Sequence, residues 1–141
     1  MLPAELVEGT SIAGNEYGWP LDRFPEAARL SAALGYACLG GQFQFRAPIG
    51  TCEMYWLNAD SAERQTGESW NSYCNRSCAE VLDRFRKVVA ETNFQAEATK
   101  WPELQTAIGN GLDIESTLAF VAHFVSESEW SADSQDQAIK V

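Results

Sequence analysis

The segment from residue 36 to residue 58 constrains the fold of this chain most strongly. It contains two strand-like runs rich in aromatic residues, separated by a turn over 47–50 that includes Pro48 and Gly50. Because side chains alternate between the faces of a strand, pairing Arg46 with Thr51 predicts which residues share a face. The predicted apolar face holds Gly41, Phe43, Phe45, Cys52, Met54 and Trp56, and the predicted polar face pairs Gln44 with Glu53, Gln42 with Tyr55 and Gly40 with Leu57.

Helical patterns flank this hairpin on both sides. A helix is predicted over 23–34, with Gly35 as its stop. A longer helix is predicted from Trp70 to Val89, because its apolar residues recur on one face, and Thr66 or Ser69 can cap it.

The C-terminal third gives weaker signals. A short helix is predicted to begin near Pro102 and to end at 109–111, after a polar linker over 92–100. Residues 113–130 show a helical stripe but are also rich in strand formers, and we predict a helix capped by Asp113. Together these elements predict an α+β fold, in which a small antiparallel sheet around the 36–58 hairpin is packed on one face by three or four helices.

The length of 141 residues predicts one domain, which we place at 1–130. Residues 131–141 have no periodicity and are predicted to form a flexible polar tail. No apolar run is long enough to cross a bilayer, and the N-terminal residues lack the pattern of a secretory signal. We therefore expect a cytoplasmic protein.

The net charge is −10 and it is unevenly distributed. Residues 21–87 carry eight acids and eight bases, whereas residues 88–141 carry nine acids and two bases. Such a charge repels phosphate backbones and anionic lipid, so we expect neither a nucleic acid nor a membrane as partner. It favours a basic protein partner, although acidity also serves solubility alone.

The cysteines and the single histidine exclude several kinds of chemistry. Cys38 and Cys52 are predicted on opposite faces of the hairpin, and Cys74 and Cys78 lie one helical turn apart, so no disulfide is expected. His123 is predicted on the polar side of a helix, beside Glu127. One histidine argues against the usual triads and multi-histidine metal sites, and we expect no metal or cofactor.

The polar hairpin face is the best candidate for a binding surface. It combines Gln42, Gln44, Glu53 and Tyr55 with the exposed backbone of Gly40. Gly41, next to Gly40, is explained more simply as room for Trp56.

Two aromatic residues near the N-terminus are further binding candidates. Tyr17 and Trp19 fall in a predicted loop over 14–20, where they can serve recognition. Packing against the core is the more frequent role for such residues.

Three functional hypotheses remain open from the sequence. The first is a non-catalytic acidic protein-binding domain, for example an inhibitor or immunity-type protein that covers a basic partner. The second is a small enzyme or ligand-binding domain that uses Gln42, Glu53 and Tyr55. The third is a homodimer paired through a sheet edge.

Overall fold

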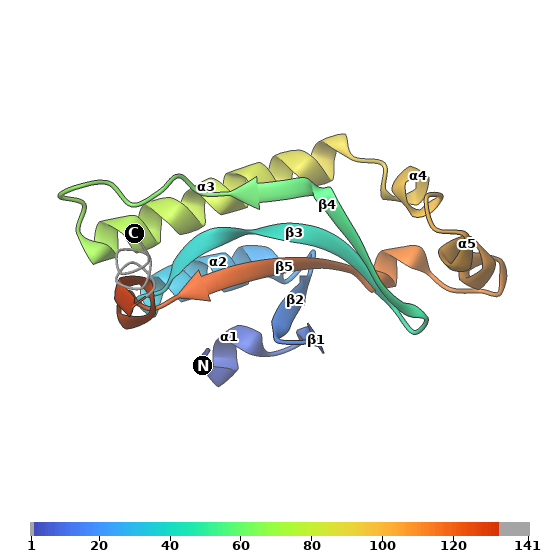
Figure 1. The fold of residues 1–141 in the computed structure, drawn as a ribbon, viewed down its shortest axis with the longest axis horizontal. Coiled ribbons are helices and arrows are strands. Elements are labelled where there is room, and N and C mark those ends of the chain that lie inside the picture. Colours follow the sequence, from blue (N-terminus) through green and yellow to red (C-terminus); the bar gives the residue numbers. More distant parts are fainter. Residues whose placement is uncertain (1, 133–141) are drawn as a thin grey trace.

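The computed structural model describes residues 2–132 and has the predicted α+β architecture (Figure 1). Its elements are α1 (Ala4–Val7), β1 (Ser11–Ala13), β2 (Glu16–Pro20), α2 (Phe24–Ala33), β3 (Ala37–Ala47), β4 (Gly50–Asp60), α3 (Trp70–Glu91), α4 (Phe94–Ala98), α5 (Pro102–Gly109), the 3-10 helix η1 (Ile114–Thr117) and β5 (Leu118–Val125). All five strands belong to one antiparallel sheet.

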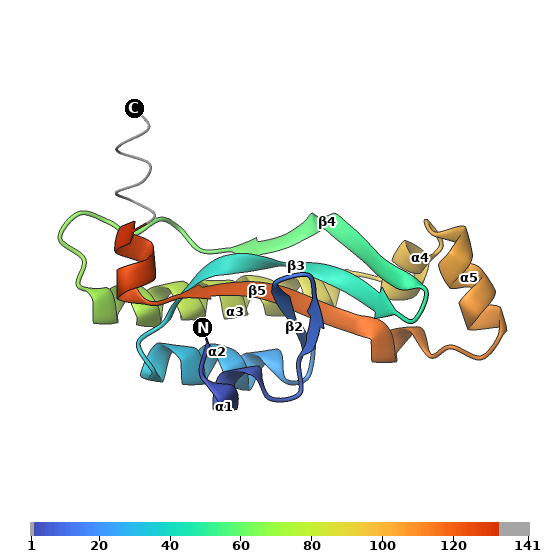
Figure 2. The same ribbon diagram turned by 60° about the horizontal axis from the view of Figure 1, so that its bottom comes forward.

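The strand order in the sheet is β1-β2-β5-β3-β4. The last strand of the chain is therefore inserted between β2 and β3, and β4 lies at an edge. Figure 2 shows α1, α2 and α3 together on one side of the sheet. Among the residues that the structure describes, no helix lies over the middle of the other side, which we call the open face.

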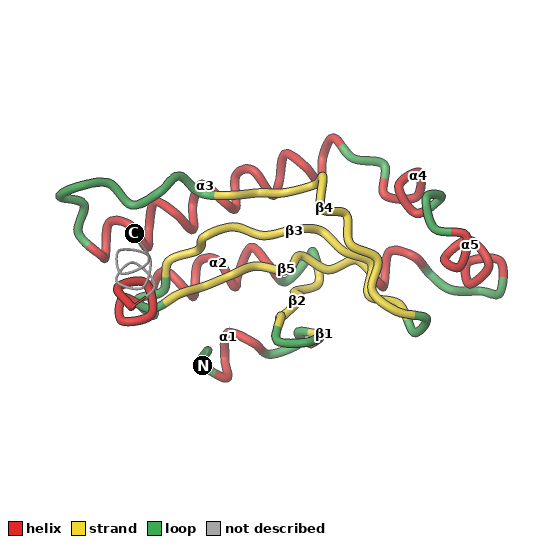
Figure 3. Tube along the Cα trace, in the orientation of Figure 1, coloured by secondary structure: helices red, strands yellow, loops and turns green. Residues whose placement is uncertain are grey.

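The predicted hairpin register is confirmed near the turn. Phe45 pairs with Cys52 and Phe43 pairs with Met54, with only Pro48 and Ile49 between the strands. Beyond Met54 the prediction is wrong, because residues 55–57 form a bulge. The bulge is visible as a sharp step in β4 (Figure 3).

The bulge changes the partners of the remaining β3 residues. Gln42 pairs with Asn58 instead of Tyr55, and Gly41 pairs with Ala59 instead of Trp56. Gly41 is needed for a different reason from the predicted one. A Cβ atom at this position would lie 2.5 Å from Cζ of Phe120 on β5 and 2.6 Å from the carbonyl oxygen of Val121.

The predicted helix over residues 113–130 is wrong, because this segment contains η1 and strand β5. Asp113 does cap the segment, but it accepts from the amide of Glu115 in a 3-10 turn. β5 pairs with β2 on one side and with β3 on the other, and its residues are buried on both faces except His123 and the partly exposed Val125. Tertiary pairing thus decides between two local patterns of similar strength.

Helices α2, α3 and α5 follow the sequence pattern. The side chain of Ser69 accepts from the amide of Ser72 and caps α3, as predicted. The φ angle of +85° at Gly35 follows α2 and suits only glycine. The polar linker predicted over 92–100 contains one short helix, α4, which Asn93 caps.

The core lies between the sheet and helices α2 and α3. Phe120 is its centre, with ring centroids 4.5 Å from Phe24, 4.8 Å from Phe43 and 5.1 Å from Phe85. These contacts join β5 to α2, β3 and α3. Aromatic pairs at such distances contribute about 0.5–1.5 kcal/mol each beyond the burial of their area.

The loop predicted over 14–20 is largely strand β2. Trp19 is 1% exposed, and its indole Nε1 donates to the carbonyl of Leu6 at 2.9 Å. Its proposed role in surface recognition is therefore wrong, and its role in the core is confirmed. Tyr17 is partly buried against the same core.

All four cysteines are buried and none forms a disulfide. Cys38 and Cys52 lie in the same core cluster, so their predicted placement on opposite faces is wrong. A register irregularity after Cys38 reverses the alternation and leaves Leu39 exposed. Burial raises the pKa of Cys74 to about 11 and raises that of Cys38 as well, so both thiols stay protonated at neutral pH.

Two further sequence predictions concern membranes and the tail. Within residues 2–132, the helices are too short or too polar to cross a bilayer. A helical turn occupies 127–132. The rest of the predicted tail, residues 133–141, lies outside the described residues.

The contact between Gly41 and Phe120 predicts a large effect of a small substitution. Gly41→Ala should lower the free energy of unfolding by about 1–3 kcal/mol, because the added methyl group overpacks the core. Gly109→Ala is the matched control, since no atom lies within 4 Å of a Cβ there. Urea denaturation of both variants measures the difference, and equal stabilities would contradict the described packing.

Candidate functional site

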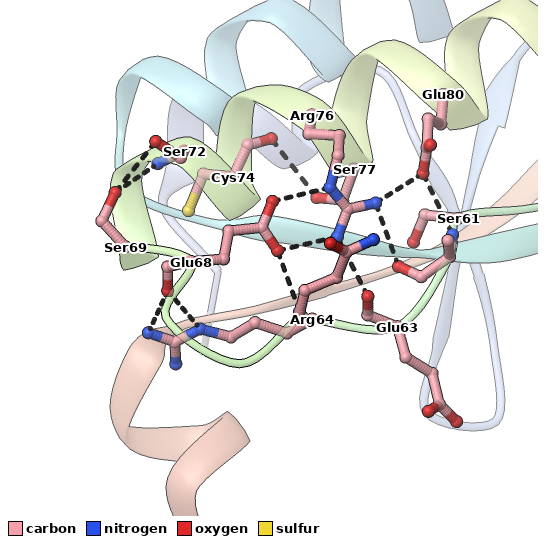
Figure 4. Close-up of polar contacts among 12 residues, drawn as sticks. Ser61, Glu63, Arg64, Glu68, Ser69, Ser72, Cys74, Arg76, Ser77 and Glu80 are labelled. Atoms are coloured by element: carbon pink, nitrogen blue, oxygen red, sulfur yellow. Dashed lines mark hydrogen bonds and ion pairs between the residues drawn. The ribbon is translucent and has the colours of Figure 1, made fainter.

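Two clusters of polar side chains lie on the surface, and the first is centred on Arg76 of α3 (Figure 4). Its guanidinium binds both carboxylate oxygens of Glu68, at 2.6 Å and 2.9 Å, and Glu80 at 2.8 Å. The carbonyls of Ala62 and Glu63 accept from the remaining N–H groups. All five guanidinium donors therefore have acceptors within the protein, and Arg76 has no donor left for a ligand anion.

The Arg76 cluster holds the loop that connects β4 to α3. Arg64 of this loop donates to the carbonyl of Glu68 and lies over the rings of Trp70 and Trp130, 5.3 Å and 4.7 Å from their centroids. Hydrogen bonds from Arg76 and from the amide of Gln65 lower the pKa of Glu68 to about 2. We interpret this cluster as structural.

The second cluster lies on the open face and begins with a row of linked side chains on β3. Arg46 Nε donates to Gln44 Oε1 at 3.2 Å, and Gln44 Nε2 donates to Gln42 Oε1 at 2.9 Å. Arg46 Nη1 also donates to the carbonyls of Ser11 and Glu16 at 2.7 Å and 3.2 Å. The row thereby connects the hairpin of β1 and β2 to the centre of the sheet.

The row also orients Gln42. Its oxygen accepts from Gln44, and among residues 2–132 its amide nitrogen has no side-chain or backbone acceptor, so its donors remain for another group. Gln44 itself is 2% exposed. Gln44 therefore positions Gln42 and does not reach a partner, which corrects its predicted place on the binding surface.

A cavity of about 310 Å³ opens on the open face beside Gln42. Four strands supply its lining, with Glu16 from β2, Leu39 and Gly40–Gln42 from β3, Glu53, Asn58 and Asp60 from β4, and Val121 and His123 from β5. The lining contains three carboxylates and no lysine or arginine. We call it the acidic cavity.

His123 lies at the acidic cavity on an exposed position of β5. Its Nε2 atom is 3.4 Å from a carboxylate oxygen of Glu16. The predicted pairing of His123 with Glu127 on a helix is therefore wrong, because the segment is a strand.

Gly40 shapes the wall of the acidic cavity. Its φ angle is +145°, and a Cβ atom there would lie 2.1 Å from Oδ1 of Asp60. The carboxylate of Asp60 thus lies directly against the backbone of Gly40. The space that glycine leaves is occupied by an acceptor group of the protein itself.

The acidic cavity suits an extended cation better than a metal ion. Within the described part of the chain, no three His, Cys, Asp or Glu side chains are close enough together to hold a metal. Glu53 and Asp60 are exposed, and neither carboxylate has an ion-pair partner among residues 2–132. A guanidinium or ammonium group is the chemical complement of such a lining.

The structure brings together only some of the residues that the sequence singles out. Gly40, Gln42 and Glu53 line the acidic cavity, whereas Tyr55 lies in the bulge of β4, is 70% exposed and does not line it.

Sequence reasoning missed Glu16, Asp60 and His123. Asp60 reaches the acidic cavity only because of the bulge, and the other two come from strands whose pairing has no local signal.

Comparison of the chain with protein-family models, with curated protein sequences and with solved structures finds no match. We therefore infer the function from the geometry of the chain itself.

The low pKa of Glu68 predicts a specific loss of stability in acid. Its stabilising effect is complete above the unfolded value of 4.5 and is lost as the pH falls toward 2, where Glu68 becomes protonated in the folded state. Glu68→Gln should lower the melting temperature at neutral pH and weaken its pH dependence between these values. Glu63→Gln is the control, since only the backbone carbonyl of Glu63 binds Arg76; identical pH profiles for both variants would contradict the structural role.

Proposed function

We propose that this chain is a non-catalytic acidic domain that binds a basic protein partner through the open face of its sheet, as an inhibitor or immunity-type protein would. The observation that carries the proposal is the acidic cavity, whose lining includes three carboxylates and no lysine or arginine. An arginine or lysine side chain of the partner supplies the missing charge.

The distribution of charge supports the same proposal. The net charge of −10 accelerates the encounter with a basic surface, and the excess of acids over residues 88–141 extends the attractive field. In the Arg76 cluster, by contrast, Glu68 and Glu80 are already paired with Arg76. The acidic cavity is therefore where an external cation finds carboxylates without a competing lysine or arginine side chain in the lining.

The competing hypothesis is a small enzyme or ligand-binding domain that uses the same cavity. Its volume and the free amide of Gln42 favour the binding of a small ligand. The position of Tyr55 outside the cavity weakens the predicted combination of Gln42, Glu53 and Tyr55 for acid–base work. Glu53→Ala distinguishes the hypotheses, because loss of a chemical activity would favour the enzyme.

Pairing through a sheet edge remains a prediction. The edge strand β4 is interrupted by the bulge at 55–57, and the other edge strand, β1, has only three residues. Short and bulged edges are typical of strands that do not add further partners.

The first test uses an amidated tri-arginine peptide as a probe, with tri-glutamine as its neutral counterpart. Titration followed by amide chemical shifts should show tri-arginine perturbing Gly40, Gly41 and His123. Glu53→Gln combined with Asp60→Asn should weaken this binding by about tenfold, or about 1.4 kcal/mol, because both carboxylates lose their charge. Added salt should weaken the wild-type complex.

The matched control removes two negative charges at another place on the surface. Glu26→Gln combined with Asp83→Asn changes two exposed acids on α2 and α3, on the opposite side of the sheet. This variant should bind the probe as the wild type does. Equal weakening in both double variants, or shifts spread over all acidic surfaces, would contradict a specific site.

A further inference from the structure

A second cavity, of about 810 Å³, lies where the C-terminal end of α3 meets two other segments. The end of β2 and the turn after it supply Pro20–Asp22, the junction of α3 and α4 supplies Val89 and Thr92–Gln95, and η1 with the start of β5 supplies Glu115, Ser116 and Leu118. It shares no lining residue with the acidic cavity. We call it the end cavity.

The wall of the end cavity is an unfilled end of the core. Val89 belongs to the apolar stripe of α3 but is 36% exposed. Phe94 packs against Phe43 with ring centroids 5.6 Å apart, which holds it in place beside Val89. Leu21 and Leu118 complete an apolar wall whose burial by a ligand would be favourable.

The charged side chains that line the end cavity, Asp22 and Glu115, are both acidic. Asn93 and Ser116 are already used, because Asn93 caps α4 and Ser116 donates to the carbonyl of Asp113. Asp22 and Glu115 approach from two different segments, are exposed, and have no ion-pair partner among residues 2–132.

Among residues 2–132, no basic side chain neutralises these two acids within the end cavity. No lysine or arginine lines it, and Arg23, which follows Asp22, lies beside Gly9 instead. A ligand that complements this lining therefore carries a positive charge.

We propose that the end cavity binds an amphipathic organic cation, with an apolar or aromatic body against Val89 and Phe94 and an amine beside Asp22 and Glu115. The volume lies within the range of small-molecule sites, which combine an apolar wall with few polar groups. The apolar wall selects the body of the ligand, and the two carboxylates select its charge. The site is independent of the proposed protein partner.

The test uses three probes with the same aromatic body and different charge, namely 1-naphthylmethylamine, 1-naphthalenemethanol and 1-naphthoate. Amide chemical shifts of the full chain are followed as each probe is added to millimolar concentration. The amine should bind most tightly and the carboxylate least, with shifts at Leu21, Val89, Phe94 and Glu115 and none at Gly40 or His123.

Two kinds of variant make the test specific. Val89→Trp places an indole against the apolar wall of the end cavity and should weaken binding of all three probes, whereas Ile49→Trp, at another exposed aliphatic residue, should leave it unchanged. Asp22→Asn combined with Glu115→Gln should lower the affinity for the amine by about tenfold, and so reduce its advantage over the alcohol, while the affinity for the alcohol stays the same.

The proposal would be overturned by any of three results. These are no shifts at the end cavity with any probe, equal affinity for the amine and the carboxylate, or binding that Val89→Trp does not change. Because the end cavity and the acidic cavity share no residue, failure here leaves the proposed protein partner untouched. The tri-arginine titration tests that partner separately.

Discussion

The contact of Phe120 with Gly41 is the interaction on which the rest of the structure depends. The ring of Phe120 occupies the place of a side chain at Gly41, so β5 can lie directly beside β3. The same ring contacts both covering helices through Phe24 and Phe85. Since alternate residues of a strand face opposite ways, this inner contact also places His123 on the open face. The pairing register of β5 with β3 thus determines both the packing of the core and the position of His123 at the acidic cavity.

Local sequence patterns predict the elements of this fold better than their partners. The apolar stripe of α3, its cap at Ser69 and the hairpin register next to Pro48 are all readable, because each depends on residues close in the chain. Residues 118–125 belong to an apolar stripe with helical spacing and are also rich in strand formers. Only the pairing with β2 and β3 makes this segment a strand. The bulge at 55–57 has no local signature either.

The candidate site was only half predictable for the same reason. Gln42 and Glu53 share a face of a local hairpin, so the sequence brings them together. Glu16 and His123 reach the acidic cavity through long-range pairing, and Asp60 reaches it through the bulge. What the structure adds is the contrast between Arg76, whose donors are all satisfied, and a cavity of carboxylates that no arginine or lysine lines.

The most direct measurement is quantitative co-purification of the tagged chain from its source cells at low and at high salt, with mass spectrometry of the captured proteins. The wild type is compared with the variant that carries Glu53→Gln and Asp60→Asn. We predict one stoichiometric basic protein that is retained at low salt, released at high salt and lost with the variant. Elution of the wild-type chain alone at both salt concentrations, or equal capture by the variant, would contradict it.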